Sequence, residues 1–157
     1  MAQKTIICLR GKENTGKTTS IRECYKLMTG KEPKTKDFIA NVEASLNIKI
    51  GFSSWGAPGA NKRVLQIVLP DNCDVVITAC RTHGGTVEAV DELAKVFGYQ
   101  VIYIYLMNGE DKVHQPIYTK MNVDAICEII ASLKLQNIPN AASCKGGNFK
   151  ILYEREY

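Results

Sequence analysis

The sequence predicts an α/β fold: a three-layer, doubly wound and mostly parallel sheet with helices on both faces. Short runs of β-branched and aromatic residues alternate with helical patterns along the chain, and short loops join them. The length of 157 residues suits one domain spanning residues 1–157, and a content of 45% apolar residues is sufficient for a core.

The first predicted elements are a strand over Thr5–Leu9 and a helix from about Gly16 to Met28. The helix has an apolar face, and Gly30 is a suitable residue for its C-terminal end. That face consists of Ile21, Cys24, Leu27 and Met28. The charged segment "KEPKTK" at residues 31–36 then indicates a solvated connector rather than a phosphate or acceptor site.

The middle of the chain predicts an antiparallel hairpin at an edge of the sheet. Its strands are Phe38–Glu43 and Leu46–Phe52, and mixed α/β sheets accept such an edge. Glycine and proline indicate a loop over residues 53–63. The segment "ANKRVLQIVL" fits a helix or a strand, and we prefer a short helix because a Pro-Asp-Asn stop and a better strand follow at once.

Two strands and a helix follow. The first strand is Asp74–Ala79, a continuous apolar run typical of a strand covered on both faces. The second strand is "YQVIYIYLM" at residues 99–107. The helix covers Thr86–Phe97, with Thr86 as its N-cap and Gly98 after its end.

The last predicted helix covers Val123–Leu135, after a loop over Asn108–Lys120, and Asn122 is its expected N-cap. Its apolar stripe consists of Ile126, Ile129, Ile130 and Leu133. The segment "NFKILYERE" near the C-terminus fits one more short strand.

Strand-to-helix loops of a doubly wound sheet meet at the carboxyl edge of its strands. We therefore expect three segments to converge there: Gly11–Thr18, Ser53–Asn61 and Arg81–Thr86. The function should reside in the crevice that they form.

The first of these segments, "GKENTGKT", matches the pattern G-x-x-x-x-G-K-[ST] between a strand and a helix. Its glycines permit backbone turns that other residues avoid. Successive N–H groups from Glu13 to Thr18 can then surround phosphate oxygens, and the helix dipole adds positive potential. A glycine-rich turn with a solvated lysine is the alternative interpretation.

This segment resembles the Walker A motif of the P-loop NTPase superfamily, and a small kinase-like member fits best. The resemblance implies a nucleoside triphosphate with Mg²⁺, with Lys17 at the outer phosphates and the Thr18 hydroxyl on the metal. It assigns nucleotide contacts to Gly11, Glu13, Asn14, Thr15, Gly16, Lys17, Thr18 and Thr19. ATP is favoured over GTP, because "TKMN" at Thr119–Asn122 has an asparagine where a guanine-reading motif needs an aspartate.

A second anion site is suggested by "CRTHGGT" at residues 80–86. Arg81 follows a strand and precedes another helix start, so a guanidinium and a helix N-terminus would face the same crevice. Lys17 and Arg81 are therefore the candidate catalytic residues, stabilising the transferring phosphoryl group. An equally weighted alternative is that the glycines form a turn and Arg81 pairs with an acid. His83 could contact a phosphate, although a solvated side chain explains it better.

P-loop enzymes usually hold Mg²⁺ through water with an aspartate at a strand end, and that aspartate is missing here. Asp74 begins its strand, so it should lie at the opposite edge. The candidates that remain for the metal shell are Asp37, Glu43, Ser53, Ser54, Glu110 and Asp111. This departure from the pattern argues against fast hydrolysis.

Four other residues could belong to the site, but an ordinary structural role explains each at least as well. Trp55 could stack on a base, and Lys62 or Arg63 could reach a phosphate, but packing or solvation explains each at least as well. His114 has even less support as a site residue.

Composition excludes several classes of protein. The six cysteines include no C-x-x-C pair, and we interpret Cys8, Cys80 and Cys127 as small buried hydrophobic residues in a reducing compartment. A net charge of +4 suits phosphorylated ligands but is too small to indicate nucleic acid. Without a membrane-length apolar run or a secretory leader, we expect a cytoplasmic protein with no membrane partner.

The sequence therefore predicts a Mg²⁺-dependent phosphotransferase that moves a phosphoryl group from a nucleoside triphosphate, ATP or GTP, to a small or phosphorylated acceptor. The alternative is a nucleotide-binding switch or regulatory ATPase that acts through a partner protein. The missing strand-end acid and the glycine-rich loop at 53–60 favour that alternative. A nucleic-acid-linked ATPase comes third because the basicity is modest.

Overall fold

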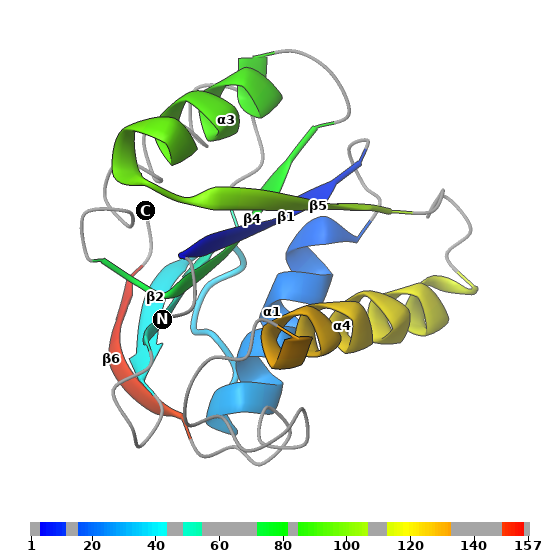
Figure 1. Ribbon diagram of the computed structural model, residues 1–157. Helices are drawn as coiled ribbons and strands as arrows, with labels where there is room; N and C mark the ends of the chain where they lie inside the picture. The colour runs from blue at the N-terminus through cyan, green and yellow to red at the C-terminus, as the bar shows by residue number, and fades with distance from the viewer. Residues whose placement is uncertain are drawn as a thin grey trace.

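A six-stranded mixed sheet forms the centre of the fold, and helices cover both of its faces (Figure 1). The computed structural model describes residues 4–11, 16–43, 49–54, 72–81, 85–106, 113–132 and 149–155. The strands are β1 (Thr5–Arg10), β2 (Ile39–Glu43), β3 (Lys49–Ser53), β4 (Val75–Cys80), β5 (Gln100–Tyr105) and β6 (Lys150–Arg155). The helices are α1 (Lys17–Thr29), α3 (Gly85–Phe97) and α4 (Gln115–Ser132). These elements confirm the predicted α/β class.

The strand order is β5-β1-β4-β3-β2-β6. β1 is parallel to β4 and β5, and β3 is parallel to β4, whereas β2 is antiparallel to both β3 and β6. The predicted hairpin of β2 and β3 is confirmed. Its predicted place at the edge of the sheet is wrong, because β6 pairs with the outer side of β2.

Each face of the sheet has its own apolar core. Ile7 and Leu9 of β1 pack with α1 and α4, whereas Ile6 and Cys8 pack with α3. Successive strand residues point to opposite faces, so the same strand supplies both cores. All six residues of β4 are buried, as predicted for a strand covered on both sides.

An aromatic cluster anchors α1 to the sheet. The ring of Tyr25 lies edge-on to the rings of Phe38 and Phe52, with centroid distances of 5.1 and 5.3 Å. The helix ends at Gly30, whose φ of 74° is left-handed, as the sequence predicts for a C-terminal glycine.

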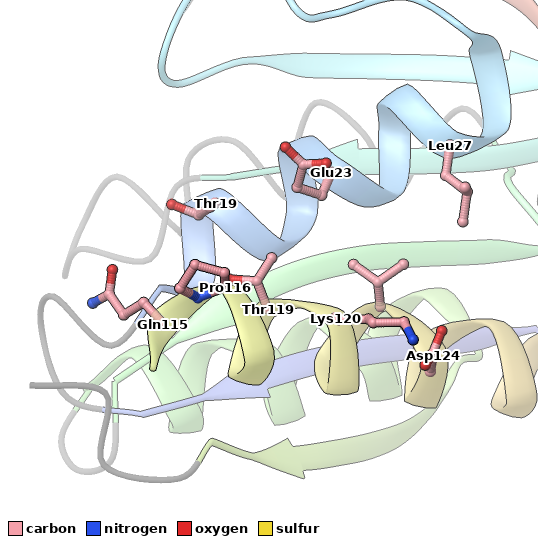
Figure 2. A pocket seen from close by; sticks show the side chains of 9 residues that line it. Thr19, Glu23, Leu27, Gln115, Pro116, Thr119, Lys120 and Asp124 are labelled. Carbon is pink, nitrogen blue, oxygen red and sulfur yellow. The ribbon is translucent and has the colours of Figure 1, made fainter. Parts of the chain in front are cut away.

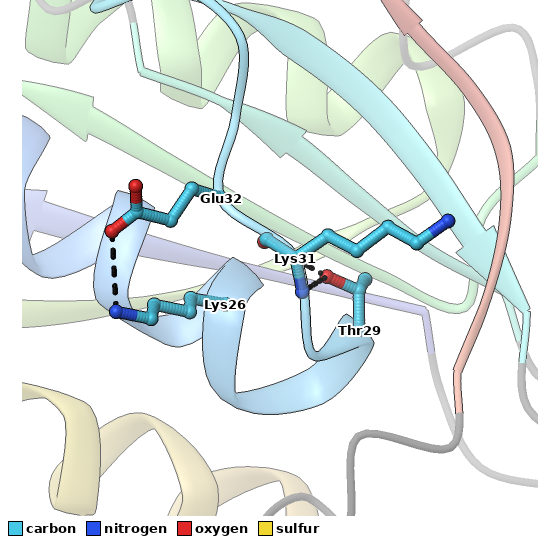
Figure 3. A network of polar contacts seen from close by, with 4 residues as sticks. All are labelled: Lys26, Thr29, Lys31 and Glu32. Carbon is cyan, nitrogen blue, oxygen red and sulfur yellow. Dashed lines mark hydrogen bonds and ion pairs between the residues drawn. The ribbon is translucent and has the colours of Figure 1, made fainter.

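The charged connector after α1 lies against the end of that helix (Figure 3). The Thr29 hydroxyl accepts a hydrogen bond from the Lys31 N–H at 3.2 Å, and Lys26 forms an ion pair with Glu32 at 3.1 Å. The side chains of this ion pair are 49% and 68% exposed, so the pair contributes little stability. A solvated connector is what the sequence predicts here.

Helix α4 begins at Gln115, well before the predicted start at Val123. Pro116 lies in its first turn, where the missing N–H costs nothing because first-turn N–H groups have no intrahelical partner. Asn122 is therefore inside the helix and is not an N-cap. Its side-chain amide donates to the Ser20 hydroxyl of α1 at 3.1 Å, so this residue joins two helices.

The predicted C-terminal strand is confirmed as β6, and it holds the end of α1. The Tyr25 hydroxyl donates to Glu154 Oε1 at 2.8 Å, and the Lys34 N–H donates to Glu154 Oε2 at 2.9 Å. The Phe149 N–H donates to the Met28 carbonyl at 3.0 Å. Burial and the Glu154 hydrogen bond raise the pKa of the Tyr25 phenol.

Other predicted boundaries shift slightly. Helix α3 begins at Gly85, so Thr86 lies within its first turn rather than at the N-cap, and Gly98 follows its end as predicted. The predicted turn at 44–47, the helix within 60–69 and Leu133 lie outside the described residues. Among the residues that are described, no helix is long and apolar enough to cross a membrane.

Candidate functional site

The carboxyl ends of β1 and β4 form a topological switch point. The two strands are parallel neighbours, in register from Thr5 opposite Val75 to Arg10 opposite Cys80. β1 leads to α1 on one face of the sheet, and β4 leads to α3 on the other (Figure 1). Strand connections that diverge in this way open a crevice, and open α/β sheets bind ligands in such crevices.

The described starts of three predicted segments lie at this edge. Gly11, Ser54 and Arg81 directly follow β1, β3 and β4, which lie side by side and run in the same direction. The predicted convergence is confirmed for these residues. The predictions for Glu13, Asn14, Thr15, Trp55, Lys62, Arg63, His83, Glu110 and Asp111 concern residues outside the described part of the chain.

The two described ends of the Gly11–Thr18 segment are drawn together. The Gly11 N–H donates to the Cys80 carbonyl at 3.2 Å, which fixes the start of the segment to β4. At its other end Gly16 has a left-handed φ of 83°, a conformation that glycine adopts at little cost. The Lys17 ammonium bends back and donates to the Gly11 carbonyl. The Lys17 ammonium, at the start of α1, therefore contacts the residue that directly follows β1.

The N-terminus of α1 is suited to an anion. Its N-cap residue, Gly16, has no side chain to bond the first N–H groups, and the first turn contains no acidic residue. Lys17 and Thr18 are half-buried, and Thr19 is exposed. The positive end of the helix dipole is thus not offset by a side chain of its own first turn.

Two cations act on the end of β4. Cys8 donates a hydrogen bond to Cys80, with 3.1 Å between the sulfur atoms. That hydrogen bond, with the positive charges of Arg10 and Lys17, lowers the pKa of Cys80 although the thiol is buried. The same hydrogen bond and burial raise the pKa of Cys8. Arg10 and Lys17 therefore place positive charge near the end of β4, although the Asp91 carboxylate acts on Cys80 in the opposite direction.

Arg10 is a site residue that the sequence analysis missed. Its guanidinium lies 5.4 Å from the ring centroid of Tyr103 and 5.0 Å from that of Tyr105, and it donates to the Tyr105 hydroxyl at 2.7 Å. Tyr103 is itself fixed by a 2.7 Å hydrogen bond to Asp91. The available signal was an arginine directly before Gly11 at the end of an apolar strand. Arg81 is half-buried directly after β4, one residue beyond Cys80, which is the residue paired with Arg10.

Asp37 is the described acid that the fold brings to this edge. β2 runs antiparallel to β3, so Phe38, which precedes β2, lies beside Ser54, which follows β3, and Asp37 is the next residue along. The Ser54 hydroxyl accepts from the Phe38 N–H at 2.9 Å and donates to Asp37 Oδ1 at 3.3 Å. Arg22 of α1 donates to the backbone carbonyls of residues 35 and 36. Asp37 is therefore held close to the first half of α1.

Other candidates for a metal shell are not suitable. Glu43 pairs with Lys49 at the far end of the hairpin, and Asp74 accepts from the Lys49 N–H at 2.9 Å, so both lie at the opposite edge. The prediction for Asp74 is confirmed, and Glu43 is wrong as a site candidate. The Ser54 hydroxyl is engaged as described, and Ser53 is fully buried with no hydrogen-bond partner for its hydroxyl among the described residues.

The five described cysteines are buried, and none of them forms a disulfide within the described residues. This confirms the predicted burial of Cys8, Cys80 and Cys127. Within the described ranges there is no group of three or more His, Cys, Asp or Glu side chains that could hold a metal. His114 is exposed, and its carbonyl accepts the N–H groups of residues 117 and 118 in the first turn of α4.

Comparisons of the chain with protein-family models, with curated proteins and with solved structures found no match. The functional argument therefore depends on the chemistry of the crevice. The Lys17 ammonium and the start of α1 lie at this edge, and Arg10 and Arg81 lie at the ends of β1 and β4, so these residues together favour a multiply charged anion.

Proposed function

We propose that this chain binds a nucleoside triphosphate with Mg²⁺ at the β1–α1 crevice and transfers its terminal phosphoryl group to a small acceptor, as a kinase does. The observation that carries the proposal is the hydrogen bond from the Lys17 ammonium to the Gly11 carbonyl. This contact and the left-handed Gly16 bring the start of α1 and a lysine ammonium to the switch point of the sheet. The resemblance of the same residues to the Walker A motif supports a triphosphate as the anion.

Lys17 is the expected contact for the outer phosphates. Its bond to the neutral Gly11 carbonyl would be exchanged for a bond to a charged phosphate oxygen, and charge-assisted hydrogen bonds are about twice as strong as neutral ones. The N–H groups at the start of α1 would bind the same phosphates. Arg81 is suited to stabilise the charge that develops on the transferring group, because it follows β4 at the same edge.

The residues present fit Mg²⁺. This ion retains several waters and needs only one or two protein oxygens. Thr18 can supply a hydroxyl, and Asp37 can supply a carboxylate through water, because Arg22 and Ser54 hold its segment close to α1. The bound ion would neutralise phosphate charge, and the protein would position the phosphates around it.

ATP is the first nucleotide to test, and GTP is the second. The partial guanine-reading pattern at Thr119–Asn122 lies inside α4, and the Asn122 amide bonds to Ser20. This structural role removes the main reason for preferring GTP.

A nucleotide-dependent switch is the second candidate, and one observation favours it. The residues that directly follow β1, β3, β4 and β5 are Gly11, Ser54, Arg81 and Leu106, so no carboxylate occupies these positions. Slow hydrolysis would follow, and slow hydrolysis suits a protein that signals through a partner.

Calorimetry tests nucleotide binding. Wild type should bind Mg·ATP, and Lys17→Ala should weaken binding about 10- to 100-fold, because a hydrogen bond to a charged group contributes about 1.5–3 kcal/mol. Lys26→Ala is the matched control, since Lys26 lies on the same helix but only in an exposed ion pair. Failure of the folded wild type to bind ATP and GTP would refute the proposal.

Product release separates the two candidates. With a panel of nucleosides, nucleotides and small metabolites, a kinase releases ADP in proportion to the correct acceptor. Slow release that no acceptor changes, and that a partner protein accelerates, would support the switch. Arg81→Ala should lower turnover far more than it lowers ATP binding if Arg81 acts on the transition state.

A further inference from the structure

A groove between α1 and α4 begins beside the proposed phosphate site (Figure 2). Its volume is about 630 Å³, which lies within the range of small-molecule pockets. Thr19, Glu23 and Leu27 form the α1 wall, and residues between Gln115 and Asp124 form the α4 wall.

The groove leads away from the start of α1. Thr19, Glu23 and Leu27 recur every four residues, so they lie on one face about 6 Å apart along the helix. Thr19 directly follows Thr18, the proposed metal ligand. Gln115 lies at this same end of the groove, whereas Leu27 lies at the far end (Figure 2). A ligand whose phosphates bind at the start of α1 can therefore continue into the groove.

The walls combine apolar and hydrogen-bonding groups. Val123 is buried, Leu27 is half-buried, and Pro116 adds a rigid apolar surface, so a flat ring has apolar contacts. Glu23 and Asp124 provide carboxylates, which accept hydrogen bonds from ribose hydroxyls in other nucleotide-binding folds.

We propose that this groove holds the nucleoside part, base and ribose, of the nucleotide whose phosphates bind at the start of α1. The inference rests on the proposed function. Continuity with the phosphate site favours a nucleoside, because the groove opens where the phosphates would end. Two carboxylates beside one lysine suit a neutral, hydroxyl-bearing group better than a second phosphorylated ligand.

The test compares Mg·ATP with Mg·tripolyphosphate, which has the phosphates but no nucleoside. Thr119→Trp places a bulky ring in the groove. Ile117→Trp is the matched control, because Ile117 is on the same helix, is 57% exposed and does not line the groove. Calorimetry should show at least tenfold weaker ATP binding for Thr119→Trp, with tripolyphosphate affinity within twofold of wild type, and the control should retain both affinities.

A second variant keeps the test informative if Thr119→Trp does not fold. Glu23→Ala changes an exposed helix residue to the best helix former, so it should fold. It should weaken ATP binding at least threefold and leave tripolyphosphate binding unchanged.

The possible outcomes test the groove assignment and the proposed function separately. Equal ATP affinity in folded Thr119→Trp and Ile117→Trp overturns the groove assignment while the phosphate site stands. So does a parallel loss of both ligands in Thr119→Trp and Glu23→Ala, or a wild type that binds tripolyphosphate but not ATP. A wild type that binds neither ligand overturns the proposed function as well.

Discussion

Replacing Tyr25 with phenylalanine should lower the free energy of unfolding by about 1.5 kcal/mol. The Tyr25 hydroxyl donates to the Glu154 carboxylate at 2.8 Å, and hydrogen bonds to charged groups contribute about 1.5–3 kcal/mol. We expect the lower end, because the bond is only partly buried and Glu154 keeps its hydrogen bond from the Lys34 N–H. Phenylalanine retains the edge-on ring contacts with Phe38 and Phe52, so the substitution isolates the hydrogen bond.

Urea unfolding followed by circular dichroism measures this loss. Tyr105→Phe is the matched control, because it also removes a hydroxyl that is hydrogen-bonded to a charged group, here as the acceptor of a bond from Arg10, but from a side chain that is 65% exposed. It should cost less than about 0.5 kcal/mol. A Tyr25→Phe protein as stable as the control would show that β6 does not hold α1 through this bond.

The pH dependence provides an independent measurement. Burial and Glu154 raise the pKa of Tyr25 above its ordinary value of 10, so above pH 10 the folded state binds the phenolic proton more tightly than the unfolded state. The resulting stability is fully present below pH 10 and is lost as the pH rises further. Wild type should therefore lose stability more steeply than Tyr25→Phe above pH 10. Parallel curves would contradict the assigned hydrogen bond.

Three further predictions concern single contacts. Asp37→Asn should raise the Mg²⁺ concentration needed for ATP binding about 10-fold, because indirect metal contacts of this kind contribute about 10- to 100-fold in affinity; an unchanged Mg²⁺ titration would exclude Asp37. Asn122→Ala should cost about 1 kcal/mol in urea unfolding, and a double-mutant cycle with Ser20→Ala should show that the two losses are not additive. Thr78→Val should leave the Tm unchanged or raise it, because the Thr78 hydroxyl is buried with no partner among the described residues; a lower Tm would reveal a hidden partner.

Local sequence patterns correctly predicted the elements whose burial does not depend on which strands lie beside them. β4 is a continuous apolar run because both of its faces are covered, and its pattern needs no knowledge of the neighbouring strands. The start of α4 was predicted wrongly because Asn122 is also a good N-cap residue. Only the contact with Ser20 across two helices shows that Asn122 has another role. Pro116, which resembled a loop residue, is equally compatible with the first turn of a helix.

In the candidate site, too, some residues could be predicted from the local sequence and others could not. Lys17 and Gly16 belong to one contiguous motif, so spacing alone was enough to single them out. Asp37 could not be chosen from the sequence over Glu43, since both flank the same hairpin. The choice depends on the direction in which β3 pairs with β4, because this parallel pairing puts the Glu43 end of the hairpin at the opposite edge of the sheet. Such long-range pairing is not encoded in either segment alone.

The position of Asp37 bears on whether the protein turns over nucleotide or switches with it. An acid at the end of a central strand is fixed by the sheet. Asp37 instead lies on a connector, held by the Ser54 hydroxyl and by Arg22 through the carbonyls of residues 35 and 36. Replacing these few hydrogen bonds with hydrogen bonds to water costs little free energy, so they fix the connector only weakly. Metal binding at Asp37 would therefore depend on the position of the connector. A nucleotide that orders this connector around Mg²⁺ would thereby change the surface between α1 and β2, and a partner could detect that change.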